Sequence, residues 1–318
     1  MQIIRLAAAF FAAFTLTITA SAKSLVPVGK TVAVKMFSDG VMVVGVEEGM
    51  ASELEKGDVI THINDTEIDT VIQLKEIVNS CDGHELDVRV NRDGHVINTG
   101  VTPVTSDGAY KLGLWIRDSM AGIGTVTFYD PATGQFGALG HGVNDVDTGR
   151  LLPLEDGAIM GSEVASVKKG QAGTPGQLTG RFDDMTDIGK VTLNTEYGIF
   201  GVMNDKNLWT GETLETAKTN EIKNGPAQII SNVQGDEVQR FDVEIIKQND
   251  SRDDRNMVIK VTDERLLAIT GGIVQGMSGS PIIQDGKLVG AVTHVLVGDP
   301  TKGYGVYIEN MIKHGEIV

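Results

Sequence analysis

The first part of the chain shows two patterns of apolar and polar positions. Alternation in KTVAVKMFSDGVMVVGV, VITHI and HELDVRVNRDGHVINTG predicts half-buried strands around Ser-Asp-Gly and Arg-Asp-Gly turns. The segment TVIQLKEIVNSC instead spaces its apolar residues as one face of an amphipathic helix. These patterns predict a small α+β module over residues 24–106.

The pattern changes from residue 107 to residue 318. Short apolar segments, such as IGKVTLNTEYGIFGVM and NMVIKVTD, alternate with clusters of Gly, Asp and Pro. Few stretches could form a helix of more than two turns. Short strands at regular spacing with turn signals between them predict a β-barrel or β-sandwich domain over 107–318.

Residues 1–22 have the pattern of an export signal. The uncharged apolar run LAAAFFAAFTLTITA follows one arginine, and the small residues of ASA have the form of a cleavage site. The run is shorter than the roughly 20 residues that span a bilayer. We therefore expect 1–22 to be a signal peptide or an N-terminal membrane anchor, and the chain to be exported.

Composition excludes several classes of partner. A net charge of -16 argues against binding to nucleic acid or to anionic lipid through a basic patch. The single cysteine, Cys81, excludes an internal disulfide, as suits a bacterial envelope protein that is stabilised by other means. There is no cysteine cluster and no HExxH pair, so we expect neither a metal nor another cofactor.

The motif GMSGSP, from Gly276 to Pro281, is the strongest chemical signal in the sequence. Glycines on both sides of Ser278 allow a sharp turn that exposes its hydroxyl. The N–H groups of Gly276 and Ser278 could then converge on an oxyanion. The motif resembles the G-x-S-G-x-P signature of chymotrypsin-like serine proteases. We predict Ser278 as the nucleophile and a structural role for Ser280.

A serine nucleophile requires a base, and His141 is the best candidate among six histidines. It lies between two glycines and precedes the serine, as in double-barrel proteases. His294 follows Thr293 on a predicted strand, where it faces either the core or the cleft. The remaining histidines are expected at surfaces or turns: His62, His84, His95 and His314.

The spacing of residues in the sequence does not decide which acid would orient the histidine. Asp263 ends a predicted strand 15 residues before Ser278, and Asp184 is the alternative. The full set of candidates is Asp145, Asp147, Asp183, Asp184, Asp187 and Asp263.

The segment VTDERLLAITGGIVQGMSGSPIIQDGKLVGAVTHVLVGDPTKGYGVYIENM, together with GALGHGV upstream, resembles the stage IV sporulation protein B peptidase family. This resemblance implies a PDZ domain followed by a chymotrypsin-like double β-barrel. It also implies a triad of His141, Asp263 and Ser278, with Thr293 on the strand beside the substrate cleft. The implied role is in spore formation: secretion between the two membranes of the developing spore, cleavage of a membrane-bound regulator of an intramembrane protease, and self-cleavage.

The order of strands, helix and hairpin over 24–106 resembles a bacterial PDZ domain, most specifically in EKGDVITHIND. Such domains bind peptide termini by strand addition beside a helix. We place the binding segment at Thr31, Val32, Ala33 and Val34, where the usual loop glycine is absent. The expected partners are therefore a protein substrate and peptide termini.

Two alternatives use the same modules. A general envelope quality-control protease is disfavoured because such enzymes usually place the protease domain before the PDZ domain. A non-catalytic PDZ binding protein is disfavoured by the intact His141, Asp263 and Ser278.

Overall fold

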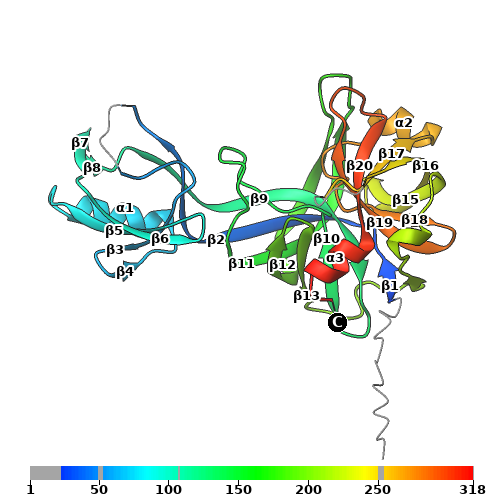
Figure 1. Ribbon diagram of the computed structural model, residues 1–318, viewed down its shortest axis with the longest axis horizontal. Coiled ribbons are helices and arrows are strands. Elements are labelled where there is room, and N and C mark those ends of the chain that lie inside the picture. The colour runs from blue at the N-terminus through cyan, green and yellow to red at the C-terminus, as the bar shows by residue number, and fades with distance from the viewer. Residues whose placement is uncertain (1–22, 49–52, 107, 250–253, 318) are drawn as a thin grey trace, which may run out of the picture.

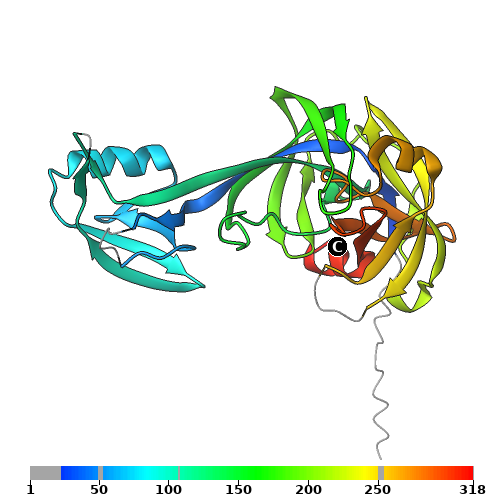
Figure 2. The same ribbon diagram turned by 90° about the horizontal axis from the view of Figure 1, so that it is seen from above.

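The computed structural model describes residues 23–48, 53–106, 108–249 and 254–317. A small module lies at one end, and two packed β-structures lie at the other (Figures 1 and 2). The predicted export signal, 1–22, lies outside the described residues. Within the described ranges, no helix is both long and apolar enough to cross a membrane.

The small module combines a sheet with one helix. The helix α1 (Val71–Ser80) begins with a capping box, in which Thr70 and Gln73 each satisfy the other's backbone N–H. Its buried residues Leu74 and Val78 pack with the inner faces of the sheet strands. The other elements of the module are β3 (Val59–Ile63), β4 (Thr66–Glu67), β5 (Leu86–Arg92), β6 (His95–Val101), β7 (Val104–Ser106) and β8 (Ala109–Lys111).

Two long strands, β2 (Thr31–Val46) and β9 (Leu114–Tyr129), join the module to the rest of the molecule (Figure 2). They pair antiparallel, with an irregularity between Phe37 and Met42. The Ser-Asp-Gly predicted as a turn therefore lies within one strand. Gly40 has a φ of +97°, and a Cβ there would lie 2.6 Å from the Ile60 carbonyl oxygen. Gly40 thus permits a bend of β2 against β3. The alternation of apolar and polar residues in the sequence does not distinguish such a bend from a turn.

The first barrel includes the earlier part of β2. Its six strands pair in the closed order β2-β9-β10-β13-β12-β11, and β11 pairs back to β2. The module predicted over 24–106 therefore shares its first long strand with this barrel, and the start of β9 belongs to the module. The additional strands are β10 (Gln135–Ala138), β11 (Leu154–Lys168), β12 (Gln177–Thr195) and β13 (Gly198–Met203).

The second barrel closes in the order β15-β16-β17-β20-β19-β18. Two six-stranded barrels and a PDZ-like module in the N-terminal part of the chain confirm the predicted fold class. The strands are β15 (Gly225–Gln234), β16 (Glu237–Gln248), β17 (Met257–Val261), β18 (Pro281–Gln284), β19 (Lys287–Val295) and β20 (Lys302–Tyr307). The remaining elements are β1 (Ser24–Pro27), β14 (Leu214–Glu215), the 3₁₀ turn η1 (Thr219–Glu221), α2 (Glu264–Thr270) and α3 (Ile308–His314).

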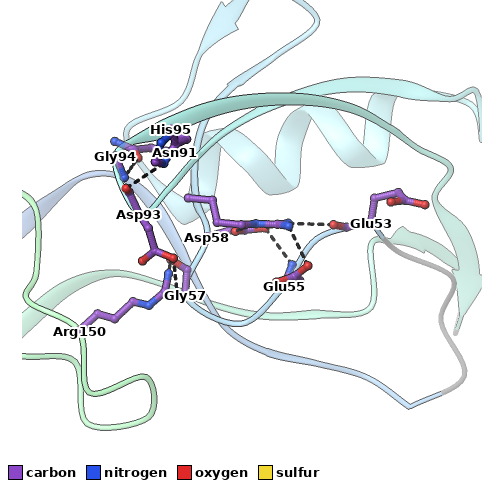
Figure 3. A network of polar contacts seen from close by, with 10 residues as sticks. Glu53, Glu55, Gly57, Asp58, Asn91, Asp93, Gly94, His95 and Arg150 are labelled. Carbon is purple, nitrogen blue, oxygen red and sulfur yellow. Dashed lines mark hydrogen bonds and ion pairs between the residues drawn. The ribbon is translucent and has the colours of Figure 1, made fainter.

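Polar contacts attach the module to the loop between β10 and β11. The Arg150 guanidinium donates to the Gly57 carbonyl at 2.8 Å and lies 3.2 Å from the Asp93 carboxylate (Figure 3). On the module side, Arg92 holds the buried carboxylate of Asp58 at 2.7 Å. The Arg150 pair with Asp93 is exposed and contributes less than about 1 kcal/mol. Its main effect is to fix the position of the loop.

Candidate active site

The serine turn is held between the two barrels. Thr125, on β9 of the first barrel, donates its N–H to the Ser278 carbonyl at 2.8 Å. Its hydroxyl donates to the Gly276 carbonyl at 2.8 Å. Gly276 and Gly279 have φ values of +99° and +97°, which side chains with a Cβ rarely adopt. The glycines predicted to shape this turn therefore do so, and the first barrel fixes its orientation.

The two serines of the motif lie in different environments. The Ser278 hydroxyl donates to the Thr293 carbonyl at 2.6 Å, at the edge of a cavity. Ser280 is fully buried, and its hydroxyl bonds to Ser231 of β15 at 3.0 Å. Ser280 thus ties the turn to the barrel wall, while Ser278 faces the cavity.

The backbone N–H groups around Ser278 divide into bonded and unbonded donors. Met277 donates to Val274, and Gly279 donates to Val292. Among the residues that the structure describes, the N–H groups of Gly276 and Ser278 have no hydrogen-bond acceptor. These are the two donors predicted for the oxyanion, so both are available to a substrate carbonyl.

His141 lies just after β10 and is half-buried. Its Nδ1 is 2.8 Å from the Gly142 carbonyl oxygen. A carbonyl only accepts, so this contact assigns the proton to Nδ1 and leaves the Nε2 lone pair to act as a base. Burial lowers the pKa of His141 below the usual 6.5, against the opposing effect of the Gly142 hydrogen bond. The imidazole is therefore neutral near pH 7, as a general base must be.

One cavity of about 550 Å³ contains both His141 and Ser278. Thr293 and His294 of β19 also line it. The structure therefore brings together three of the four residues that the family resemblance implies. Most of the remaining lining is apolar, from Val34, Met36, Met120, Ile123, Leu139, Val143, Val146, Ile273, Val274, Val295 and Val297.

Asp263, the predicted acid, caps the N-terminus of α2. Its Oδ1 accepts from the N–H groups of Arg265 at 2.9 Å and Leu266 at 3.4 Å. Its Oδ2 lies 2.8 Å from the Arg265 guanidinium. Within the described residues, His141 has no hydrogen bond with Asp263. The role of Asp263 as the triad acid stays a prediction that these contacts do not favour. The side chains of Asp183 and Asp184 lie outside the described ones.

The cap at Asp263 makes stability depend on pH. Hydrogen bonds from Arg265 are the largest of the effects that lower the pKa of Asp263 from 3.8 to about 2. The ionised carboxylate therefore stabilises the fold fully above about pH 4, and this contribution is lost as the pH falls towards 2. We expect Asp263→Ala to lower the free energy of unfolding by about 1–2 kcal/mol at pH 7. Urea titrations of both proteins should show the difference shrinking below pH 4; a difference that stays constant to pH 2 would contradict the assignment.

Asp254 is a site residue that the sequence did not reveal. It lies within the charged segment QNDSRDDRN between β16 and β17, a pattern typical of a solvated hairpin loop. Its carboxylate lies 3.3 Å from Nδ1 of His294, and the His294 ring centroid is 4.7 Å from that of His141. Only the pairing of β17 with β20 and of β20 with β19 brings these segments together. No local pattern encodes that proximity.

The predicted peptide-binding segment, Thr31 to Val34, is wrong. These residues pair with β9 on one side and with β11 on the other, so they offer no free strand edge. They are also buried in the wall of the first barrel. A barrel strand paired on both sides cannot accept an added peptide strand.

The module has a different groove that suits a peptide. In the described structure, residues 114–117 of β9 pair only with β2, so their other edge is open. This edge faces α1 across a cavity of about 490 Å³ that is lined by Leu74, Val78 and residues 109–116. Gly113, with a φ of +65°, lies at the start of the open edge, in the sequence KLGL. PDZ domains usually have a glycine in the loop before the peptide-binding strand. The sequence prediction placed this strand at the start of β2, where no glycine directly precedes the strand, whereas Gly113 occupies that position before β9.

Comparison with known families decides the identity of the chain. Residues 108–312 match the SpoIVB peptidase S55 family, and residues 31–102 match the PDZ domain. The chain belongs to the SpoIVB peptidase S55 family. It is thus a serine peptidase with a PDZ domain, as the sequence resemblance implied. No curated protein matches the chain significantly.

Solved structures similar to this S55 peptidase include the Rv3671c protease from M. tuberculosis. The match with its active form has 12% sequence identity and a TM-score of 0.34. It covers 61% of this chain and 74% of the Rv3671c chain. The match with the inactive form of a serine-to-alanine mutant of Rv3671c has 13% sequence identity and a TM-score of 0.33. It covers 61% of this chain and 82% of the Rv3671c chain.

Proposed function

We propose that this S55 peptidase is an exported endopeptidase of sporulation signalling. It cleaves a membrane-bound regulator of an intramembrane protease, and it cleaves its own chain. The observation that carries the catalytic part is that Ser278 and His141 share one cavity, beside two N–H donors that have no acceptor in the described part of the chain. The signalling role rests on family membership and on the signal-like segment 1–22, and it places the enzyme between the two membranes of the developing spore.

The mechanism follows from the geometry of the turn. When a substrate carbonyl enters the cavity, the Ser278 hydroxyl exchanges its bond with the Thr293 carbonyl for one with Nε2 of His141. His141 removes the proton as the serine oxygen attacks, and the N–H groups of Gly276 and Ser278 stabilise the oxyanion. The imidazolium then protonates the leaving amine, and water hydrolyses the acyl-enzyme.

A cellular experiment tests the signalling role. In a spore-forming bacterium that lacks its own S55 peptidase, the wild-type chain should restore spore formation and Ser278→Ala should not. Failure of the wild type to restore spores, with intact peptidase activity in vitro, would contradict the signalling role. Rapid degradation of unfolded proteins by the purified enzyme would instead favour envelope quality control.

The cavity lining predicts the side chains that the enzyme accepts next to the scissile bond. No Asp, Glu, Lys or Arg side chain from the described residues lines the cavity that contains Ser278. An ionised side chain buried there would lose its hydration without a partner. We expect peptides with Val or Leu at the residue cleaved to exceed those with Asp by about 100-fold or more in kcat/KM. A peptide series varied at that residue measures this; equal kcat/KM for Val and Asp would contradict it.

We further propose that the groove between α1 and β9 binds a peptide terminus. Trp115, which is 69% exposed, lines this groove and offers an optical signal. A peptide with an apolar last residue and a free carboxylate should change its fluorescence at saturable concentrations, and the amidated peptide should bind at least several-fold more weakly. Trp115→Phe is the control, because it leaves only Trp209 of the peptidase domain. Equal binding of the two peptides would exclude carboxylate recognition.

A further inference from the structure

Among the residues that the structure describes, no carboxylate occupies the usual place beside the catalytic histidine. His141 contacts the Gly142 carbonyl through Nδ1, and no carboxylate of the described residues is hydrogen-bonded to it. A carbonyl fixes the tautomer, but it carries only a partial negative charge. Serine peptidases generally use a carboxylate to stabilise the imidazolium that forms in the transition state. A charge that serves this purpose should therefore lie close to His141.

Asp254 is connected to the nucleophile through Thr293. The Thr293 hydroxyl donates to the Asp254 carbonyl at 3.1 Å, and the Thr293 carbonyl accepts from Ser278 at 2.6 Å. Thr293 is 1% exposed, so this link is shielded from water. The connection fixes the backbone of Asp254 relative to the serine, although Asp254 lies on the loop between β16 and β17.

Asp254 is connected to the base through His294. Its carboxylate, whose side chain is 14% exposed, lies 3.3 Å from Nδ1 of His294. The His294 ring lies beside that of His141, with centroids 4.7 Å apart and an interplanar angle of 38°. Asp263, in contrast, is occupied by Arg265 and by the N-terminus of α2.

We propose that Asp254 supplies the carboxylate of the catalytic centre and acts on His141 through His294. The negative charge of Asp254, 3.3 Å from Nδ1 of His294, holds the ring in place and makes it more electron-rich. His141 takes the proton from Ser278 while it lies beside this electron-rich ring. The nearby negative charge stabilises the positively charged imidazolium of His141. Asp254 and His294 are thus positioning residues for the reaction of Ser278 and His141.

Other charged groups around this pair affect its pH response. Arg255 lies 3.8 Å from the Asp254 carboxylate. Arg150 and Glu196 of the first barrel, together with Asp93 of the module, line the neighbouring polar cavity that His294 shares. They stay unchanged in the variants below, so a difference in pH profile reports on Asp254 and His294.

The test measures labelling of Ser278 by a fluorophosphonate probe in the full chain, from pH 5 to 9. It requires no natural substrate, so its outcome does not depend on the sporulation role. We expect Asp254→Asn to slow labelling by about 100-fold, to shift the acid limb of the profile, and to leave the thermal midpoint near that of the wild type. Asp254→Glu should restore part of the rate. His294→Gln should slow labelling to a similar extent.

Asp263→Asn is the decisive comparison, and Asp299→Asn, on the loop before β20, is the matched control for loss of a carboxylate. The proposal requires Asp254→Asn to lower the rate more than Asp263→Asn does. It is overturned if Asp254→Asn keeps the wild-type rate and profile, or if only Asp263→Asn abolishes labelling without unfolding. A wild-type chain that does not take the probe would overturn the assignment of Ser278 itself, and this proposal with it.

Discussion

Ser278→Ala is expected to lower kcat by about 10⁶-fold, because removal of the nucleophile removes the covalent route altogether. The Ser278 hydroxyl is the group that faces the cavity shared with His141. Its loss leaves the turn intact, since Thr125 binds the backbone carbonyls of Ser278 and Gly276 rather than the hydroxyl. Peptide hydrolysis and fluorophosphonate labelling should both disappear, while the thermal midpoint stays close to that of the wild type.

Ser280→Ala provides the matched control. It leaves the Ser231 hydroxyl without its buried partner, which costs about 1–3 kcal/mol in the free energy of unfolding. Labelling should persist in the folded fraction of this variant. If Ser280→Ala abolished labelling and Ser278→Ala did not, the assignment of the nucleophile would be reversed.

Gly279→Ala should destabilise the protein by about 3–5 kcal/mol. A Cβ at this position would lie 1.9 Å from the Thr125 carbonyl oxygen and 2.6 Å from the Leu139 N, which are both backbone atoms of the first barrel. The φ of +97° adds a conformational cost of about 1–2 kcal/mol. The turn can relieve the contact only by moving away from β9. Denaturant unfolding of the purified variant measures the loss.

Gly286→Ala separates the two contributions. Gly286 has a φ of +77°, and a Cβ there would meet no atom within 4 Å. This variant should therefore show only the conformational cost of about 1–2 kcal/mol. Equal destabilisation by Gly279→Ala and Gly286→Ala would mean that the packing of the serine turn on Thr125 contributes nothing.

The parts of the site that could be predicted are those with local signatures. The glycines around Ser278 and His141 are visible in the sequence because the backbone conformation they allow is a property of neighbouring residues. The different environments of Ser278 and Ser280 could be predicted for the same reason. The alternation of apolar positions likewise gave the strands and the helix of the small module.

The errors concern contacts between distant segments. Alternation over Thr31 to Val34 indicates a strand, but it does not say how many neighbours that strand has. The open edge instead belongs to β9, which the sequence analysis placed in the second domain. Asp254 is not among the candidates that the sequence offers, because its proximity to His294 depends on strand pairing in the second barrel. The charge and spacing of residues in the sequence do not predict such strand pairing.

The shared ribbon of β2 and β9 has a topological consequence. Phe37 and Ser119 are paired neighbours in that ribbon, and the chain between them makes up the small module. The PDZ domain is therefore an insertion within a β-hairpin of the peptidase, rather than a unit that precedes it on a linker. Cleaving the chain before residue 107 would remove a wall strand of the first barrel together with the module. Excising residues 38–118 and joining the two strands by a tight turn would keep the barrel closed.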